Sequence, residues 1–157
     1  MRVIYPGSFH PPTLGHINII RRAASMFDEV LVAVMMNPEK TYLFSPERRV
    51  DMLERCLSDL ENVRVVADGG LLAELCIREK ADAILRSLRS SADYEYEWPL
   101  ALANHAIGAP ETIYIQAEPS LMHISSTIAS DIARHGGDLK GFIPAELIEE
   151  VRDAFHK

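Results

Sequence analysis

The stretch YPGSFHPPTLGH, residues 5–16, combines turn residues with two histidines directly after the apolar start MRVI. Gly7 permits a tight turn, and Thr13 is placed to cap a helix whose first turn would contain Gly15 and His16. Such a helix start collects unpaired N–H groups and favours a neutral imidazole over imidazolium. One interpretation is a phosphate site, with close approach at Gly15 and a neutral donor on His16. The other is ordinary turn glycines and a surface histidine.

A second candidate anion site lies near the other end of the chain, in the segment ISST of residues 124–127. Ser125, Ser126 and Thr127 come at the expected start of a short helix that Gly136 and Gly137 would close. Their hydroxyl and N–H groups could bind phosphate, and a plain helix cap is compatible with that role.

Two arginines follow the apolar run DAILR closely. Arg86 and Arg89 are three residues apart, so both could point into one cleft, where guanidinium groups can bind phosphate in a bidentate manner. A solvated surface pair is the alternative.

These residues need a scaffold, and the hydrophobic pattern predicts an α/β fold. Short apolar runs alternate with segments of helical period, which indicates a doubly wound, five-stranded parallel sheet in a single domain of residues 1–157. The carboxyl ends of such strands are where ligands bind. We expect strands at 2–5, 29–36, 62–67, 82–86 and 112–117.

Helices are expected in the segments between these strands and after the last one. Ser45 and Pro46 should begin the second helix, and Pro99 should bend or break the fourth. The last helix should begin at Pro144. The ranges of the others are 13–27, 71–80 and 91–108.

Composition excludes several classes of protein. The formal charge is −7 and the pI is near 5.3, whereas nucleic-acid-binding domains usually carry an excess of Lys and Arg. Two cysteines without metal-ligand spacing indicate neither a disulfide framework nor a zinc site, and a reducing cytosol fits them. No apolar run reaches the roughly 20 residues of a membrane span, and no signal peptide is recognised. We expect a soluble, cytoplasmic protein.

The two phosphate elements together resemble the signature of the nucleotidyltransferase superfamily, which pairs (H/T)xGH near the N-terminus with ISS(S/T) near the C-terminus. Here they read Thr13-Leu14-Gly15-His16 and Ile124-Ser125-Ser126-Thr127. Within it, the chain resembles most the bacterial phosphopantetheine adenylyltransferase family. The matching stretches are YPGSF, NPEKTYLFSPERRVDML, LRSLRSSADYEYE and ARHGGDLKGFIPAEL.

The resemblance implies an enzyme that joins ATP to 4′-phosphopantetheine, giving dephospho-coenzyme A and pyrophosphate. It implies Mg²⁺ as cofactor, a homo-oligomer that is a hexamer, and feedback binding of coenzyme A. It places catalytic roles on His16, Lys40 and Arg89. The implied acceptor-binding residues are Ser8, Lys40, Leu72, Arg86 and Asn104, with Leu71 beside them. The implied ATP-binding residues are Gly7, Ser8, Phe9, Gly15, His16, Arg89, Glu97, Ile124, Ser125, Ser126 and Thr127.

Three positions depart from the pattern of that family. His10 replaces an Asp and would bring an imidazole beside the phosphate turn. Ser87 replaces a Gly and could alter the backbone, and Ser130 removes a cation from the triphosphate side. The stretch SFHPPTLGH also resembles the opening of nicotinamide mononucleotide adenylyltransferases, which are one alternative. A cytidylyltransferase for a small phosphorylated alcohol is another. A catalytically weakened paralogue that binds nucleotide or coenzyme A would explain the altered positions.

Overall fold

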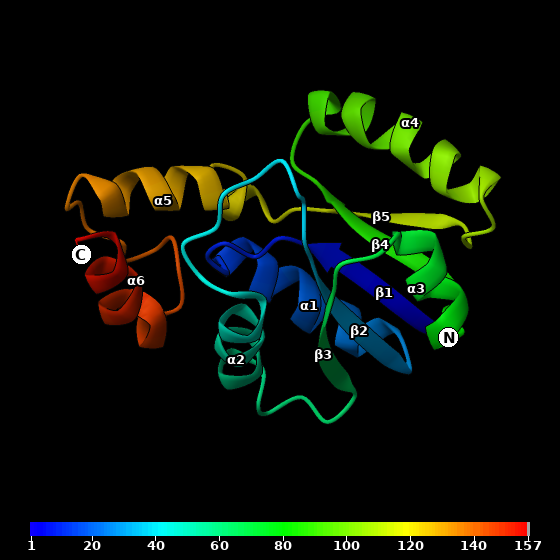
Figure 1. Cartoon of the computed structure of the whole chain (residues 1–157), viewed down its shortest axis with the longest axis horizontal. Helices are drawn as coiled ribbons and strands as arrows, with labels where there is room; N and C mark the ends of the chain where they lie inside the picture. The colour runs from blue at the N-terminus through cyan, green and yellow to red at the C-terminus, as the bar shows by residue number, and fades with distance from the viewer. Residues whose placement is uncertain (157) are drawn as a thin grey trace.

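The computed structural model describes residues 1–156 and contains one five-stranded parallel sheet in the order β3-β2-β1-β4-β5 (Figure 1). The expected α/β architecture is confirmed. The strands are β1 Arg2–Gly7, β2 Glu29–Met35, β3 Val63–Asp68, β4 Ala83–Leu88 and β5 Thr112–Gln116. The helices are α1 Leu14–Met26, α2 Pro46–Cys56, α3 Leu72–Glu79, α4 Ser91–Ala106, α5 Ser126–Arg134 and α6 Ile148–Phe155, with 3-10 turns η1 Pro119–Leu121 and η2 Ala145–Leu147.

Both faces of the sheet are covered, because side chains alternate along each strand. On β1, Val3 and Tyr5 join the larger core cluster, which also contains buried residues of α1, α2, α5 and α6. Ile4 belongs to the other cluster, which contains the buried residues of α3. The apolar runs of the strands are therefore explained by burial on two sides.

Strands β1 and β4 separate toward their carboxyl ends. Every residue of β1 from Arg2 to Gly7 is paired with a residue of β2. In contrast, only Val3 and Ile4 of β1 are paired with β4, opposite Ala83 and Ile84. Strand order reverses at this point of the sheet, which is where open α/β sheets bind ligands.

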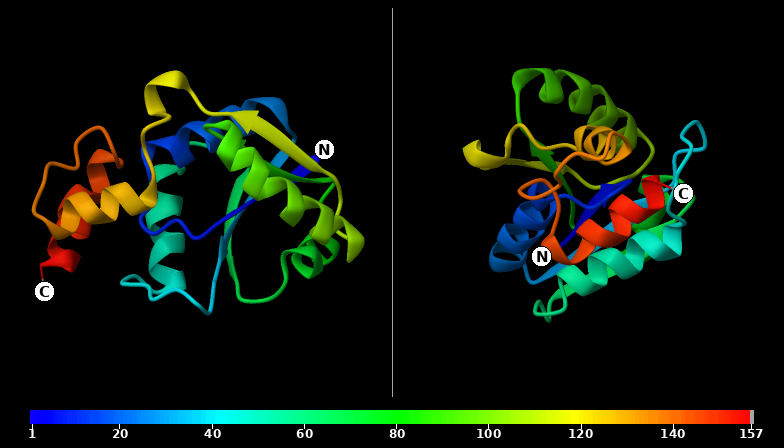
Figure 2. Two further views of the ribbon diagram at one scale, coloured as in Figure 1. Left: turned by 90° about the horizontal axis from the view of Figure 1, so that it is seen from above. Right: turned by 90° about the vertical axis from the view of Figure 1, so that its left-hand side faces the viewer.

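Helices α5 and α6 lie together beyond one end of the sheet (Figure 2). Glu150 of α6 forms salt bridges with Arg48 and Arg55 of α2. This pair of contacts ties the C-terminal helix to the helix that follows β2.

The structure differs from the sequence expectations at two helices: the break allowed for at Pro99 is absent, and the last helix begins later than predicted. Helix α4 continues through Pro99 without a break. It lies on the surface with no fully buried residue, so water can hydrate the carbonyl that the missing proline N–H leaves unpaired. The last helix begins at Ile148, because the segment after Pro144 first forms the turn η2.

Candidate active site

Two adjoining cavities open where β1 and β4 separate. The first, here called the helix-end cavity, lies at the N-termini of α1 and α5. The second, the loop cavity, is bounded by residues 35–42, by Leu72 and by α4. The residues that line both cavities are Pro6, Gly7, Ser8, Arg86 and Glu97. A ligand in one cavity would therefore meet a ligand in the other at this shared wall.

The structure brings together nearly all the site residues predicted from the sequence. Lining the helix-end cavity are Gly7, Ser8, Phe9, Gly15, His16, Arg86, Arg89, Glu97, Ile124, Ser125 and Ser126. Lining the loop cavity are Ser8, Lys40, Leu72, Arg86, Glu97 and Asn104. Thr127 and Leu71 are exposed and line neither cavity. Of the residues predicted for only one ligand, Gly7, Arg86 and Glu97 line both cavities, and the others that line a cavity line only one.

His16 is held as a neutral donor by the capping of α1. Its Nδ1 accepts a hydrogen bond from the Thr13 backbone N–H at 3.1 Å, while Thr13 Oγ1 accepts from the His16 N–H. Burial, together with the charges of Arg89 and Arg86, lowers the pKa of His16 to about 4. With Nδ1 acting as acceptor, the neutral imidazole carries its proton on Nε2. A neutral donor was expected here, and the cap explains which nitrogen donates.

The start of α1 has few N–H groups left for a ligand. The Leu14 N–H donates to the Phe142 carbonyl at 2.9 Å, and the His16 N–H is taken by Thr13. The Gly15 N–H lies between them at the cavity wall. Any anion at this helix end would therefore meet the Gly15 N–H and the His16 side chain.

The turn after β1 differs from expectation. Its left-handed residue is Phe9, with φ of 47°, and Gly7 is an ordinary strand residue. Gly7 is required for another reason, since a Cβ there would lie 2.9 Å from Phe9 Cζ. A left-handed phenylalanine costs free energy, so the surrounding contacts must hold this turn.

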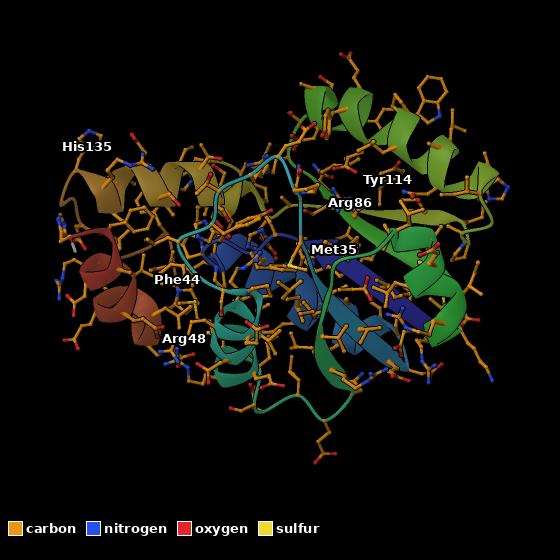
Figure 3. The ribbon with its side chains drawn as sticks, viewed as in Figure 1. Met35, Phe44, Arg48, Arg86, Tyr114 and His135 are labelled. Carbon is orange, nitrogen blue, oxygen red and sulfur yellow. The ribbon has the colours of Figure 1, made fainter. Side chains whose placement is uncertain are left out.

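Arg86 is held between the sheet and α4 (Figure 3). It donates to the Pro6 carbonyl at 2.8 Å and forms a two-pronged ion pair with Glu97, with Nε 2.7 Å from Oε2. Burial lowers the pKa of Arg86, but the hydrogen bonds and charge of Glu97 outweigh it, so that pKa is raised. Arg86 is therefore a fixed cation at the wall between the cavities.

Arg89 lies on the far side of the helix-end cavity, paired with Asp93. Its backbone N–H donates to the Asp93 carboxylate at 2.8 Å, and its Nη1 donates to the Ile124 carbonyl at 3.2 Å. Burial raises the pKa of Asp93, but the Arg89 hydrogen bonds outweigh this and hold it below its ordinary value. Arg89 thus joins β4 to the segment that leads into α5.

The hydroxyl groups at the start of α5 are largely committed to the protein itself. Ser125 Oγ accepts from the Ile128 N–H at 3.1 Å, and Ser126 Oγ donates to the Pro11 carbonyl at 2.7 Å. The Ser126 hydroxyl proton is therefore occupied. Anion binding at this helix end would rely on the backbone N–H groups and on the remaining Ser125 proton.

Comparisons with known proteins agree with this site. The sequence model of the cytidylyltransferase-like family matches residues 4–131. A phosphopantetheine adenylyltransferase of Clostridium perfringens is 43% identical over 155 residues, covering 98% of this chain and 94% of its own. The enzymes of Kocuria rhizophila and Aquifex aeolicus are 42% and 40% identical, covering 97% and 99% of this chain and 98% and 96% of their own. The chain belongs to the phosphopantetheine adenylyltransferase family. The resemblance predicted from the two motifs is confirmed.

His10, the first departure from the pattern of the phosphopantetheine adenylyltransferase family, does not face the helix-end cavity. Its Nε2 accepts from the Leu43 and Phe44 N–H groups at 2.8 and 3.2 Å. Burial and the charge of Arg49 lower its pKa to about 4, so it is a neutral acceptor that fixes the loop before α2. The imidazole beside the phosphate turn that we expected is turned toward this loop.

The other two departures are also accommodated. Ser87 lies in β4 without a positive φ, so its backbone conformation does not require a glycine. Ser130 donates to the His10 carbonyl at 3.3 Å and lines a separate cavity with Arg134 and Phe155. Ser87 lines the helix-end cavity, with its hydroxyl 3.4 Å from that of Tyr5, whereas Ser130 lines neither cavity of the candidate site.

Arg49 and Asp93 were not predicted from the sequence to be functional residues. Arg49 lies in the charged run ERR, which reads as a solvated helix face, yet it is fully buried. Its position three residues before Met52 and four before Leu53 places it on the apolar face of α2, and that spacing was the available signal. Asp93 has the four-residue spacing from Arg89 that predicts a helical pair.

Proposed function

We propose that this chain transfers the adenylyl group of ATP to 4′-phosphopantetheine, giving dephospho-coenzyme A and pyrophosphate. The shared wall of the two cavities carries this proposal, because it would place two anionic ligands in contact. The helix-end cavity would hold the triphosphate. The loop cavity, with Leu72 and Asn104 beside Lys40, suits a phosphate at the end of an apolar and amide-rich arm. The names of the relatives support the choice of substrates.

The arrangement would act by positioning and by charge stabilisation. An oxygen of the acceptor phosphate would bond to the α-phosphorus of ATP as the bond from that phosphorus to the pyrophosphate oxygen breaks. The nucleophile is already an anion, so no side chain has to remove a proton. His16 Nε2–H would donate to an α-phosphate oxygen as its charge grows, and Lys40 would hold the acceptor phosphate.

Arg86 and Arg89 would neutralise the negative charge of different ligands. Arg86 lines both cavities and would face the acceptor phosphate as well as the nucleotide. Arg89 lines only the helix-end cavity and would serve ATP. Because each is held by a carboxylate, the site keeps its cations in place before a ligand arrives.

We further propose that Mg²⁺ accompanies ATP. Both carboxylates of the helix-end cavity, Asp93 and Glu97, are occupied by arginines, and no cluster of three metal-ligating side chains exists within residues 1–156. The donor set fits an ion held mainly by phosphate oxygens and water. Such an ion would neutralise charge on the leaving pyrophosphate.

We propose a hexamer and feedback binding of coenzyme A on family resemblance, and a cytoplasmic location and no nucleic-acid partner on composition and charge. No helix within residues 1–156 is long and apolar enough to cross a bilayer. Light scattering of the purified protein would test the hexamer, and competition between coenzyme A and ATP would test feedback binding.

Pyrophosphate release is the direct test of the main proposal. Reactions would contain ATP with 4′-phosphopantetheine, ATP with nicotinamide mononucleotide, ATP alone, and CTP with glycerol 3-phosphate. We expect turnover only in the first. Turnover confined to the second or fourth would identify one of the other transferases, and nucleotide binding without turnover in any mixture would identify a binding paralogue.

A further inference from the structure

Arg49 is a charged residue of α2 whose side chain is buried in the protein interior. Its side chain is fully inaccessible, and within residues 1–156 it forms no salt bridge. One guanidinium nitrogen, Nη2, has no hydrogen-bond partner. Burying a cation without a counter-charge is costly, and an apolar side chain of the same size would pack there with less penalty. Packing alone therefore does not account for an arginine at this position.

Nε of Arg49 donates to the Ser45 carbonyl at the start of α2, and a second hydrogen bond leads to the turn after β1. Its Nη1 donates to the Ser8 carbonyl at 2.7 Å. That carbonyl belongs to the peptide that joins Ser8 to Phe9, which is trans. The C=O and N–H of a trans peptide point in opposite directions, so fixing the Ser8 oxygen against Arg49 directs the Phe9 N–H away from α2.

The Phe9 N–H is well placed to bind a phosphate. Phe9 lines the helix-end cavity, and no protein acceptor within residues 1–156 meets its N–H. Its φ of 47° is sparsely populated for a side chain with a Cβ. Left-handed residues of this kind turn successive backbone N–H groups toward an anion, and they persist only where surrounding contacts hold them.

We propose that Arg49 is a positioning residue for adenylyl transfer: it holds the Ser8–Phe9 peptide so that the Phe9 N–H donates to the phosphate of the nucleotide. The inference rests on the proposed function, and it assigns Arg49 a role through the backbone of the turn. Arg49 lines neither of the two cavities and would touch neither substrate.

The same guanidinium also contacts Tyr42, in the loop that contains Lys40. Its Cζ lies 4.1 Å from the centre of the Tyr42 ring, and the Tyr42 hydroxyl accepts from the Asn37 N–H at 3.1 Å. The Lys40 N–H in turn donates to the Asn37 carbonyl at 3.0 Å. Arg49 thus connects the turn of the helix-end cavity with the loop of the other cavity, and it sets the position of Lys40 relative to Ser8.

The first experiment compares Arg49→Met with Arg55→Met. Both lie on α2 and lose the same charge, but Arg55 is half-exposed and remote from the cavities. We expect the kcat of Arg49→Met to fall at least ~tenfold, since a lost phosphate donor has effects of that order or more. Its Tm should stay close to that of the parent, because removal of the unpaired buried charge offsets the loss of the donor to the Ser8 carbonyl. Arg55→Met should retain the parent kcat.

Arg49→Lys separates positioning from a general need for charge. A lysine can donate to the Ser8 carbonyl but cannot stack a planar group on Tyr42. It should therefore recover much of the kcat lost in Arg49→Met, while its KM for 4′-phosphopantetheine should exceed that of the parent, because the loop of Lys40 is no longer held. This variant also supplies the result if Arg49→Met does not fold.

Nuclear magnetic resonance tests the inference without the acceptor. In protein labelled with nitrogen-15 on its five phenylalanines, ATP alone should shift the Phe9 amide resonance, and Arg49→Met should abolish that shift. An unmoved Phe9 amide in the parent protein would overturn the inference. So would a folded Arg49→Met variant with a kcat within about twofold of the parent. Absence of turnover in the parent would refute only the proposed function, because the amide measurement requires no acceptor.

Discussion

The backbone N–H of Thr13 donates to Nδ1 of His16 across 3.1 Å, within a capping box at the start of α1. The cap of the helix thereby selects the tautomer of the imidazole that faces the helix-end cavity. A residue that begins a secondary-structure element thus also decides which ring nitrogen can donate to a ligand.

Replacing His16 by Ala should lower kcat by two orders of magnitude or so and change the ATP dissociation constant little. The reason is that the Nε2–H bond strengthens as charge grows on the α-phosphate. Steady-state kinetics and calorimetric ATP binding would measure the two effects. His105→Ala, at an exposed position near the end of α4, is the control. Equal losses in kcat and in ATP affinity would contradict a transition-state role.

Lys40 and Arg89 should affect different substrates, because each lines only one of the two cavities. Lys40→Met should raise the KM for 4′-phosphopantetheine roughly tenfold or more and leave ATP binding nearly unchanged. Arg89→Met should weaken ATP binding instead. Lys140→Met removes an exposed cation elsewhere and should alter neither. The same pattern in both cavity variants would show that the two spaces do not hold separate ligands.

Stability should fall as the pH is lowered from about 6.5 toward 4. His10 and His16 have pKa values of about 4 in the folded protein, below the ordinary value of 6.5. In that window the unfolded chain binds protons that the native state does not, so folding is fully favoured above pH 6.5 and penalised below it. Urea unfolding at intervals from pH 7.5 to 4.5 measures the slope. His10→Asn should reduce the slope by up to one proton, and an unchanged slope would disprove the contribution of His10.

His10→Asp should stabilise the protein at neutral pH. A carboxylate could accept from the Leu43 and Phe44 N–H groups as the imidazole does, and it would give Arg49 a nearby counter-charge. His10→Asn supplies an acceptor without the charge, so the difference in Tm between the two variants isolates the ion pair. A Tm for His10→Asp at or below that of His10→Asn would mean that the carboxylate does not reach Arg49.

Much of the fold could be predicted because strands buried on two faces leave a strong mark in the sequence. The runs around Val32 and Leu85 are apolar throughout, and each is followed by a segment of helical period. Thr13, Gly15 and His16 could be placed for a similar reason, since helix starts have local rules of spacing and capping.

The parts that escaped prediction depend on contacts between distant segments. Arg49 is buried because Ser8, far from it in sequence, presents a carbonyl to α2. The left-handed turn falls on Phe9 because its ring packs over Gly7 and beside His16. His10 turns toward Leu43 because the N–H groups of Leu43 and Phe44 donate to its Nε2. Local propensity contains none of this information, which is why His10 and Gly7 were given roles that the structure assigns differently.

The early end of the β1–β4 ladder has a cost and a benefit. Beyond Ile4 the residues of the two strands are no longer paired, and the Pro6 carbonyl accepts a hydrogen bond from the side chain of Arg86. Continued pairing would strengthen the sheet and seal the opening from which both cavities lead. The separation of β1 and β4 therefore lowers the stability of the sheet and keeps both cavities accessible. Variants selected only for thermal stability would be expected to extend the pairing of these strands.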